Sequence, residues 1–158
     1  MLRDGELILL DVGASVDGYA ADITRTYAKG DVSDRFAHVH LEVEKAHKKI
    51  IRLLKPGLAV KEYMTQVDVI MKQALTNVGL LNDEKDYRKY FPHSISHGLG
   101  IDVHDSLGNP NTFKPGMVLT VEPGIYITEE GIGVRIEDDI LITESGHENL
   151  SEMLPTSL

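Results

Sequence analysis

The chain has 158 residues and a formal net charge of −9, with 42% hydrophobic and 26% charged residues; this length and composition predict one globular domain that spans residues 1–158. The acidic charge, without a basic patch, argues against a nucleic-acid partner, and no apolar run approaches the roughly 20 residues that span a membrane. The absence of cysteine excludes disulfides and thiolate metal sites, and, since no signal peptide or anchor is visible, it favours a cytoplasmic protein.

A β-hairpin is predicted at the start of the chain. Residues 6–12 read as a buried strand and residues 18–27 as its partner. A turn on Asp17–Gly18, the better turn dipeptide, makes Asp11 and Asp22 diagonal neighbours, whereas a turn one residue earlier places them directly opposite each other. Both registers leave the two carboxylates on one face of the hairpin.

Two helices are predicted next. Ser33 can cap a helix that runs to about Leu54, where Pro56–Gly57 stops it, and a second helix spans residues 60–78 with Gly79 after its end. Both segments carry apolar residues at helical spacing.

The remainder of the chain reads as loops and strands. Residues 82–90 are polar and are predicted to form a loop, and residues 118–121, 125–127 and 134–142 are predicted strands. A hairpin, two helices and a strand-rich half together predict an α+β fold, with helices covering one face of a curved antiparallel sheet.

Asp11 and Asp22 are the first candidate metal ligands. A lone aspartate at a strand end is more often a turn or cap residue, but these two share a face of one apolar hairpin. Burying an unpaired carboxylate costs several kcal/mol, so each needs a cation or a dense set of hydrogen bonds.

A cluster of histidines follows the helical part. His93, His97 and His104 lie within residues 92–105, around Gly98 and Gly100, whose missing side chains let the backbone approach a ligand closely. One such histidine is usually structural, but three around two glycines favour a site. The other histidines lack this context: His38, His40, His47 and His147.

Two glutamates complete the pattern. Glu122 and Glu137 lie in apolar, strand-like segments, where a charge must be compensated or must face solvent. Arg135 shares a strand face with Glu137 and could hold a carboxylate in place. Oxygen ligands with a single nitrogen suit two divalent cations such as manganese, cobalt, iron or zinc. The sequence therefore predicts a two-metal hydrolytic site formed by Asp11, Asp22, His97, Glu122 and Glu137.

Five segments resemble the motifs of one known family, in the same order: LDVG at 10–13, GYAADITRT at 18–26, SHGLGIDVHD at 96–105, LTVEPG at 119–124 and GVRIEDD at 133–139. They resemble the catalytic domain of Xaa-Pro aminopeptidases and prolidases. These are pita-bread metallopeptidases, with the creatinase/aminopeptidase fold that methionine aminopeptidase also has. The resemblance implies a dinuclear centre, usually manganese, and cleavage of peptides with proline at the second position. It covers almost the whole chain.

The resemblance also implies a role for each residue. Asp11 chelates one ion, Asp22 and Glu137 bridge both, and His97 and Glu122 complete the second. A hydroxide bridging the ions is the implied nucleophile, with Glu122 as general base and acid. The remaining implied positions are His93 and His104 beside the scissile carbonyl, Arg135 behind the ligands and Tyr126 near the pocket.

Several alternatives stay open. The motifs do not separate an aminopeptidase from a prolidase, which cleaves dipeptides only, and a catalytically silent peptide-binding fragment is the reading from another class. Family members carry an N-terminal domain, and their catalytic domain begins upstream of the position of Met1. The chain is therefore expected to be the C-terminal part of a pita-bread domain: a fragment, a split gene product, or a scaffold completed by another copy or by the missing N-terminal half.

Overall fold

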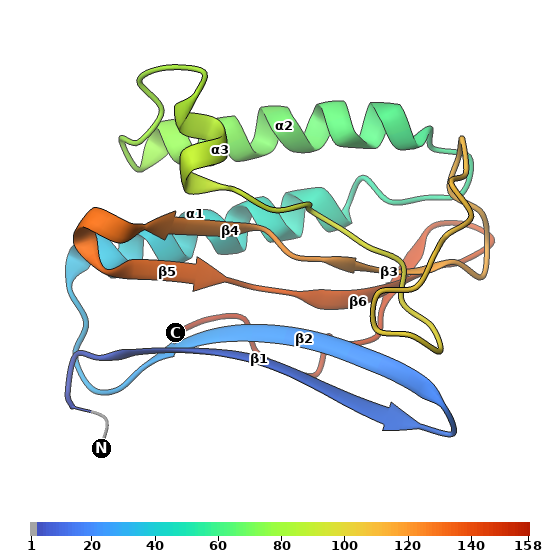
Figure 1. Cartoon of the computed structure of the whole chain (residues 1–158), viewed down its shortest axis with the longest axis horizontal. Coiled ribbons are helices and arrows are strands. Elements are labelled where there is room, and N and C mark those ends of the chain that lie inside the picture. Colours follow the sequence, from blue (N-terminus) through green and yellow to red (C-terminus); the bar gives the residue numbers. More distant parts are fainter. Residues whose placement is uncertain (1–2) are drawn as a thin grey trace.

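The computed structural model describes residues 3–158 and has an α+β architecture, as predicted (Figure 1). Its strands form three small antiparallel sheets, with the orders β1-β2, β3-β6-β7 and β4-β5. The elements are β1 (Leu7–Val16), β2 (Tyr19–Ala28), α1 (Asp34–Ile51), α2 (Val60–Asn77), α3 (Asp86–Tyr90), β3 (Val118–Val121), β4 (Gly124–Ile127), the 3-10 turn η1 (Thr128–Glu130), β5 (Ile132–Arg135), β6 (Asp138–Ile142) and β7 (His147–Asn149).

The hairpin turn lies on Asp17–Gly18. Both residues have positive φ angles, 52° and 87°, as a two-residue type I′ turn requires. Gly13 therefore pairs with Asp22, and Asp11 pairs with Thr24. The register with diagonal aspartates is confirmed, and the alternative with Asp11 directly opposite Asp22 is wrong.

The prediction that the first strand is buried is wrong, because Leu7, Ile8 and Leu9 are only partly buried and the following residues are exposed. Leu10 is 45% exposed and Val12 is 56% exposed. β1 pairs only with β2 among the described residues, so its free edge and the face turned away from the body stay open to solvent.

Both long helices begin as predicted. The Ser33 side chain accepts a hydrogen bond from Phe36 N at 3.2 Å and caps α1, which ends at Ile51. α2 ends at Asn77, and Gly79 follows with φ of 75°, the left-handed conformation that commonly terminates helices.

The predicted loop at residues 82–90 is wrong in its second half, because α3 occupies Asp86–Tyr90. Asp86 Oδ2 accepts the backbone N–H groups of Asn82 at 3.0 Å and Asp83 at 2.9 Å. Tyr87 is buried and donates its hydroxyl to Asp68 Oδ1 at 2.6 Å. The loop was predicted from the mainly polar composition of residues 82–90, which gave no indication that Tyr87 is buried.

The predicted strand at residues 134–142 is instead two strands, β5 and β6. β5 pairs with β4, whereas β6 pairs with β3 and β7. Between them, Glu137 forms an isolated bridge with Thr24 of β2. The chain changes partners at this point, which interrupts the strand and turns Glu137 toward the hairpin.

The core lies between the helices and the strands of the second half. α1 packs against α2, β3, β4 and β5, and its buried face includes Phe36, Val43 and Ile50. Figure 1 shows the hairpin along one side of the molecule and α2 along the opposite side, with β3 to β6 between them. Within residues 3–158, every helix is too short or too polar to traverse a bilayer.

Candidate metal centre

The five predicted ligands come together from distant parts of the chain. The hairpin contributes Asp11 and Asp22, whose donor oxygens lie within 4.8 Å of each other and of a Glu137 oxygen. Donor atoms of His97, Glu122 and Glu137 form a second such group. Glu137 belongs to both groups, so the two sets of donors are adjacent.

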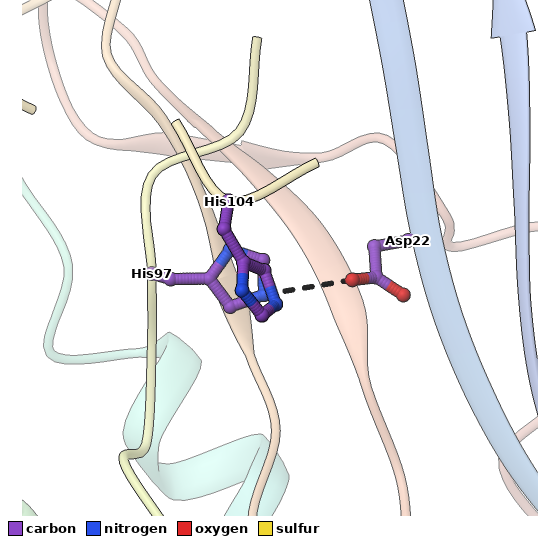
Figure 2. Close-up of side chains that lie close together, drawn as sticks. All are labelled: Asp22, His97 and His104. Carbon is purple, nitrogen blue, oxygen red and sulfur yellow. Dashed lines mark ion pairs between the residues drawn. The ribbon is translucent and has the colours of Figure 1, made fainter. Parts of the chain in front are cut away.

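His97 directs one ring nitrogen toward the carboxylates. Its Nδ1 lies 3.0 Å from the carbonyl of Gly98, so this nitrogen carries the proton and Nε2 is left free to act as a ligand. Nε2 lies 3.5 Å from Asp22 Oδ2, 3.7 Å from Glu122 Oε1 and 4.0 Å from Glu137 Oε1. Figure 2 shows His97 facing Asp22, with His104 beside it.

The loop that carries His97 is held closely against β3. Gly98 forms bridges with both Asp105 and Leu119, and His97 O accepts a hydrogen bond from Thr120 N at 3.0 Å. A Cβ atom on Gly98 would lie 2.5 Å from the Asp105 carbonyl oxygen. Only glycine therefore fits here without a shift of the backbone.

Burial raises the pKa values of three of the four carboxyl groups. Burial, together with the charges of Glu122 and Asp22, raises the pKa of Glu137 to about 8. Burial also raises the pKa of Asp22, with the Asp11 charge as the next cause, and burial raises the pKa of Glu122. Each shift favours the neutral acid until positive charge is supplied.

Arg135 supports the group from one side. It donates to Asp11, to Thr24 Oγ1 at 3.1 Å and to the Tyr126 hydroxyl at 3.0 Å, and its Nε lies 3.9 Å from Glu137 Oε2. The carboxylate that Arg135 contacts most directly is that of Asp11. The Asp11 side chain is otherwise 53% exposed, so this contact limits its motion.

His93 lies at the edge of the five residues, whereas a ring nitrogen of His104 lies within 4.8 Å of donor atoms of His97 and Asp22. His93 Nε2 is 2.9 Å from the Tyr126 hydroxyl, and Nδ1 is 2.7 Å from the Ser94 carbonyl and 3.5 Å from Glu122 Oε2. Because Tyr126 accepts from Arg135, its own proton points to His93 Nε2, and the His93 proton resides on Nδ1. The His104 ring is centred 4.2 Å from that of His97.

Three supporting residues were not assigned from the sequence. Thr24 Oγ1 donates to Glu137 Oε2 at 2.5 Å, Thr26 Oγ1 donates to Arg135 O at 2.9 Å, and Asp139 Oδ2 accepts from Asp22 N at 3.2 Å. A signal for the threonines was present, since residues 22, 24 and 26 alternate along one face of β2. No comparable signal marks Asp139.

The donor set fits divalent cations. Four carboxylates and one imidazole are hard or borderline ligands, and two such ions would supply the four positive charges that offset the carboxylates. Residues 1–144 match the family model of metallopeptidase family M24. The chain belongs to this family.

Individual M24 proteins agree with this assignment. The Xaa-Pro aminopeptidase of Escherichia coli K12 is 40% identical in an alignment 170 positions long, which covers 95% of this chain and 38% of that protein. The structure of proline aminopeptidase P II from Yersinia pestis matches with a TM-score of 0.90 and 40% identity, over 99% of this chain and 41% of that one. The structure of zinc-substituted E. coli aminopeptidase P in complex with product matches with a TM-score of 0.87 and 39% identity, over 99% of this chain and 40% of that one.

These matches confirm the predicted family and the pita-bread aminopeptidase P fold. The chain spans about two fifths of the length of the curated relatives that it matches, such as 38% of the E. coli protein and 41% of the Haemophilus influenzae Xaa-Pro aminopeptidase. It corresponds to the C-terminal catalytic part of these M24 proteins.

Proposed function

We propose that the chain is the metal-binding part of a proline-directed aminopeptidase, which releases the N-terminal residue of peptides with proline at the second position. The observation that carries this proposal is the convergence of five donor side chains into two groups that share Glu137. The names of the M24 relatives support the substrate class.

The ligand roles follow from the two groups. Asp11 would hold one ion and His97 and Glu122 the other, while Asp22 and Glu137 would contact both. The position of Asp22 supports its role, because its carboxylate lies near Asp11 on one side and 3.5 Å from His97 Nε2 on the other. Manganese is the proposed metal, with cobalt, zinc and iron as alternatives of the same ligand preference.

Glu122 is the proposed general base and acid. Two bound cations would lower the pKa of a water molecule toward neutrality. Glu122 could take the proton from such a water and pass it to the leaving amine, because its carboxylate lies among the proposed ligands, with Oε1 3.7 Å from His97 Nε2.

His93 and His104 are proposed to bind and orient the peptide. Burial lowers the pKa of His93, so its ring is neutral near pH 7, and its single N–H, on Nδ1, is directed to the Ser94 carbonyl at 2.7 Å and lies 3.5 Å from Glu122 Oε2. His104 is exposed beside His97, where a substrate carbonyl could accept its N–H.

A manganese titration tests the centre. Calorimetry with the 158-residue chain should show two ions per chain, and metal at a hundredfold excess over Kd should stabilise the fold by about 2.7 kcal/mol for each bound ion. Asp22→Asn and Glu137→Gln should abolish most of this gain, whereas the matched exposed changes Asp31→Asn and Glu148→Gln should not.

Peptide assays then test the reaction. Xaa-Pro-Xaa tripeptides should be cleaved in preference to Xaa-Ala-Xaa tripeptides, and cleavage restricted to Xaa-Pro dipeptides would instead identify a prolidase. A folded chain whose melting temperature does not respond to manganese or cobalt would contradict the metal centre and favour a silent peptide-binding fragment.

A further inference from the structure

Arg25 is a buried arginine whose hydrogen-bonding capacity is fully used. It lies on the face of β2 opposite Asp22 and Thr24, and only 5% of its surface is exposed. A guanidinium group has five N–H donors, and all five have partners: Pro155 O at 3.0 Å, Thr24 O at 2.9 Å, Glu137 O at 2.7 Å, Asp138 Oδ1 at 2.6 Å and Leu154 O at 3.0 Å.

These partners belong to three separate segments. Thr24 lies on the hairpin that carries Asp11 and Asp22, Glu137 and Asp138 lie just before and at the start of β6, and Leu154 and Pro155 lie near the C-terminus. Arg25 is therefore a single rigid connector between the strand that carries Asp22, the residue that carries the shared carboxylate, and the last part of the chain.

The C-terminal segment is itself tied to the residues that follow Glu137. Asn149 Nδ2 donates to Asp138 Oδ2 at 2.6 Å, Leu150 N donates to Asp139 O at 2.9 Å, and Asp139 N donates to Ser151 Oγ at 3.1 Å. We call residues 149–155 the C-terminal strap. The strap lies outside residues 1–144, the part of the chain that the M24 family profile matches.

We infer that Arg25 is a positioning residue of the metal centre and that the C-terminal strap is its anchor. This inference rests on the proposed function, because it concerns the placement of proposed ligands that Arg25 itself does not touch through their side chains. Arg25 binds the carbonyl of Glu137 and that of its bridge partner Thr24, and so sets the separation between the hairpin and Glu137.

The geometry explains why another cation cannot replace Arg25. Lysine has three donors on one point-like ammonium group, whereas the planar guanidinium reaches partners in several directions. Without the guanidinium group, the carbonyls of Thr24 and Glu137 lose their shared donor, Arg25 Nη1. Asp22 and Glu137 are then free to move apart. Loss of such outer contacts typically weakens metal affinity about 10- to 100-fold.

The first test compares Arg25→Lys with Arg35→Lys. Arg35 also donates to a carboxylate and a carbonyl, those of Glu130 and Val78, but it lies outside the centre. Manganese calorimetry is carried out at a temperature where circular dichroism shows each variant to be folded. We expect the Kd of Arg25→Lys to rise at least about tenfold and that of Arg35→Lys to stay at the wild-type value. Millimolar guanidinium chloride should restore affinity to Arg25→Ala but not change the wild type.

The second test leaves Arg25 and all five proposed ligands in place. A chain ending at Glu152 lacks the Leu154 and Pro155 carbonyls, whereas a chain ending at Thr156 keeps them and also keeps the Thr156 contact with Glu44. We expect weaker manganese binding only for the shorter chain. Without metal, the Glu137 amide, which donates to Thr24 O, should exchange faster in that chain alone.

The outcomes separate the two proposals. If the wild-type chain binds no manganese, the proposed function fails and the positioning role with it. The two decisive variants are Arg25→Lys and the chain ending at Glu152. If the wild type binds two ions and both of these variants, when folded, bind them equally well, only the positioning role is overturned. Loss of the whole fold in both variants would also overturn it, because Arg25 would then support the entire domain and not the centre in particular.

Discussion

Thr24 Oγ1 lies 2.5 Å from Glu137 Oε2, although 113 positions separate the two residues in the sequence. Glu137 N also donates to Thr24 O at 3.0 Å. Because Thr24 Oγ1 accepts from Arg135 Nε, its own proton is directed to Glu137. The hydroxyl thus fixes one carboxylate oxygen of Glu137 and leaves the other, Oε1, facing His97.

Replacing Thr24 tests this relationship. Thr24→Val keeps the shape of the side chain but removes the donor, so Glu137 should lose its orientation and manganese affinity should fall about tenfold or more. Thr24→Ser keeps the hydroxyl and should bind manganese nearly as the wild type does. Equal calorimetric Kd values for Thr24→Val and the wild type would show that the hydrogen bond does not matter for the centre.

Metal binding should release protons near neutral pH. The pKa of Glu137 is raised to about 8, so in the metal-free protein at pH 7 this carboxyl group is largely protonated, and a cation must displace that proton. Manganese affinity should therefore rise from pH 6 to 8, with about one proton released at pH 7 and fewer above pH 9. Calorimetry in buffers of different ionisation enthalpy measures the release. A proton count that does not change between pH 7 and pH 9 would contradict this.

The buried residue His47 should make the metal-free protein acid-sensitive. Burial lowers the pKa of His47 from 6.5 to about 4, so the unfolded chain takes up the proton first as the pH falls. The free energy of unfolding should drop between about pH 6.5 and pH 4, by roughly 3 kcal/mol from this residue. Urea denaturation across this range should show a flatter profile for His47→Gln, and an unchanged profile for the exposed control His38→Gln. Identical profiles for His47→Gln and the wild type would refute the assignment.

Gly98 should not tolerate a side chain. A Cβ atom there would lie 2.5 Å from Asp105 O and 2.9 Å from Leu107 Cγ, so Gly98→Ala should destabilise the protein by about 1–3 kcal/mol and weaken manganese binding by moving His97. A Cβ atom on Gly146 would have no neighbour within 4 Å, and Gly146→Ala serves as the control. Thermal unfolding with and without manganese measures both effects. Wild-type behaviour of Gly98→Ala would show that the loop is able to move without loss.

The elements with strong local signals were predictable from the sequence. Ser33 marks a helix start through its side chain and Gly79 a helix end through its backbone conformation, and Asp17–Gly18 was the better turn dipeptide for one of the two hairpin registers. The alternation of side chains along β2 placed Asp22 on a definite face. Such features depend on a few neighbouring residues, so sequence spacing is enough to recognise them.

Features that depend on distant partners were not predictable in the same way. The break between β5 and β6 arises because Glu137 bridges to Thr24, and α3 forms around the burial of Tyr87 among mainly polar neighbours. The role of Arg25 depends on the carbonyls of Leu154 and Pro155, and a backbone acceptor leaves no trace in the residue type. The five ligand side chains were recognisable by their chemistry, whereas the hydrogen bonds that orient them required the fold.

The bridge between Thr24 and Glu137 has a consequence for biosynthesis. During translation the hairpin emerges early and carries Asp11 and Asp22, but its partner carboxylate is made more than a hundred residues later. Closing so long a loop is slow compared with forming a local hairpin. A ribosome-bound chain that stops short of Glu137 lacks the carboxylate that the two donor groups share, so neither proposed group is complete until residue 137 has been made.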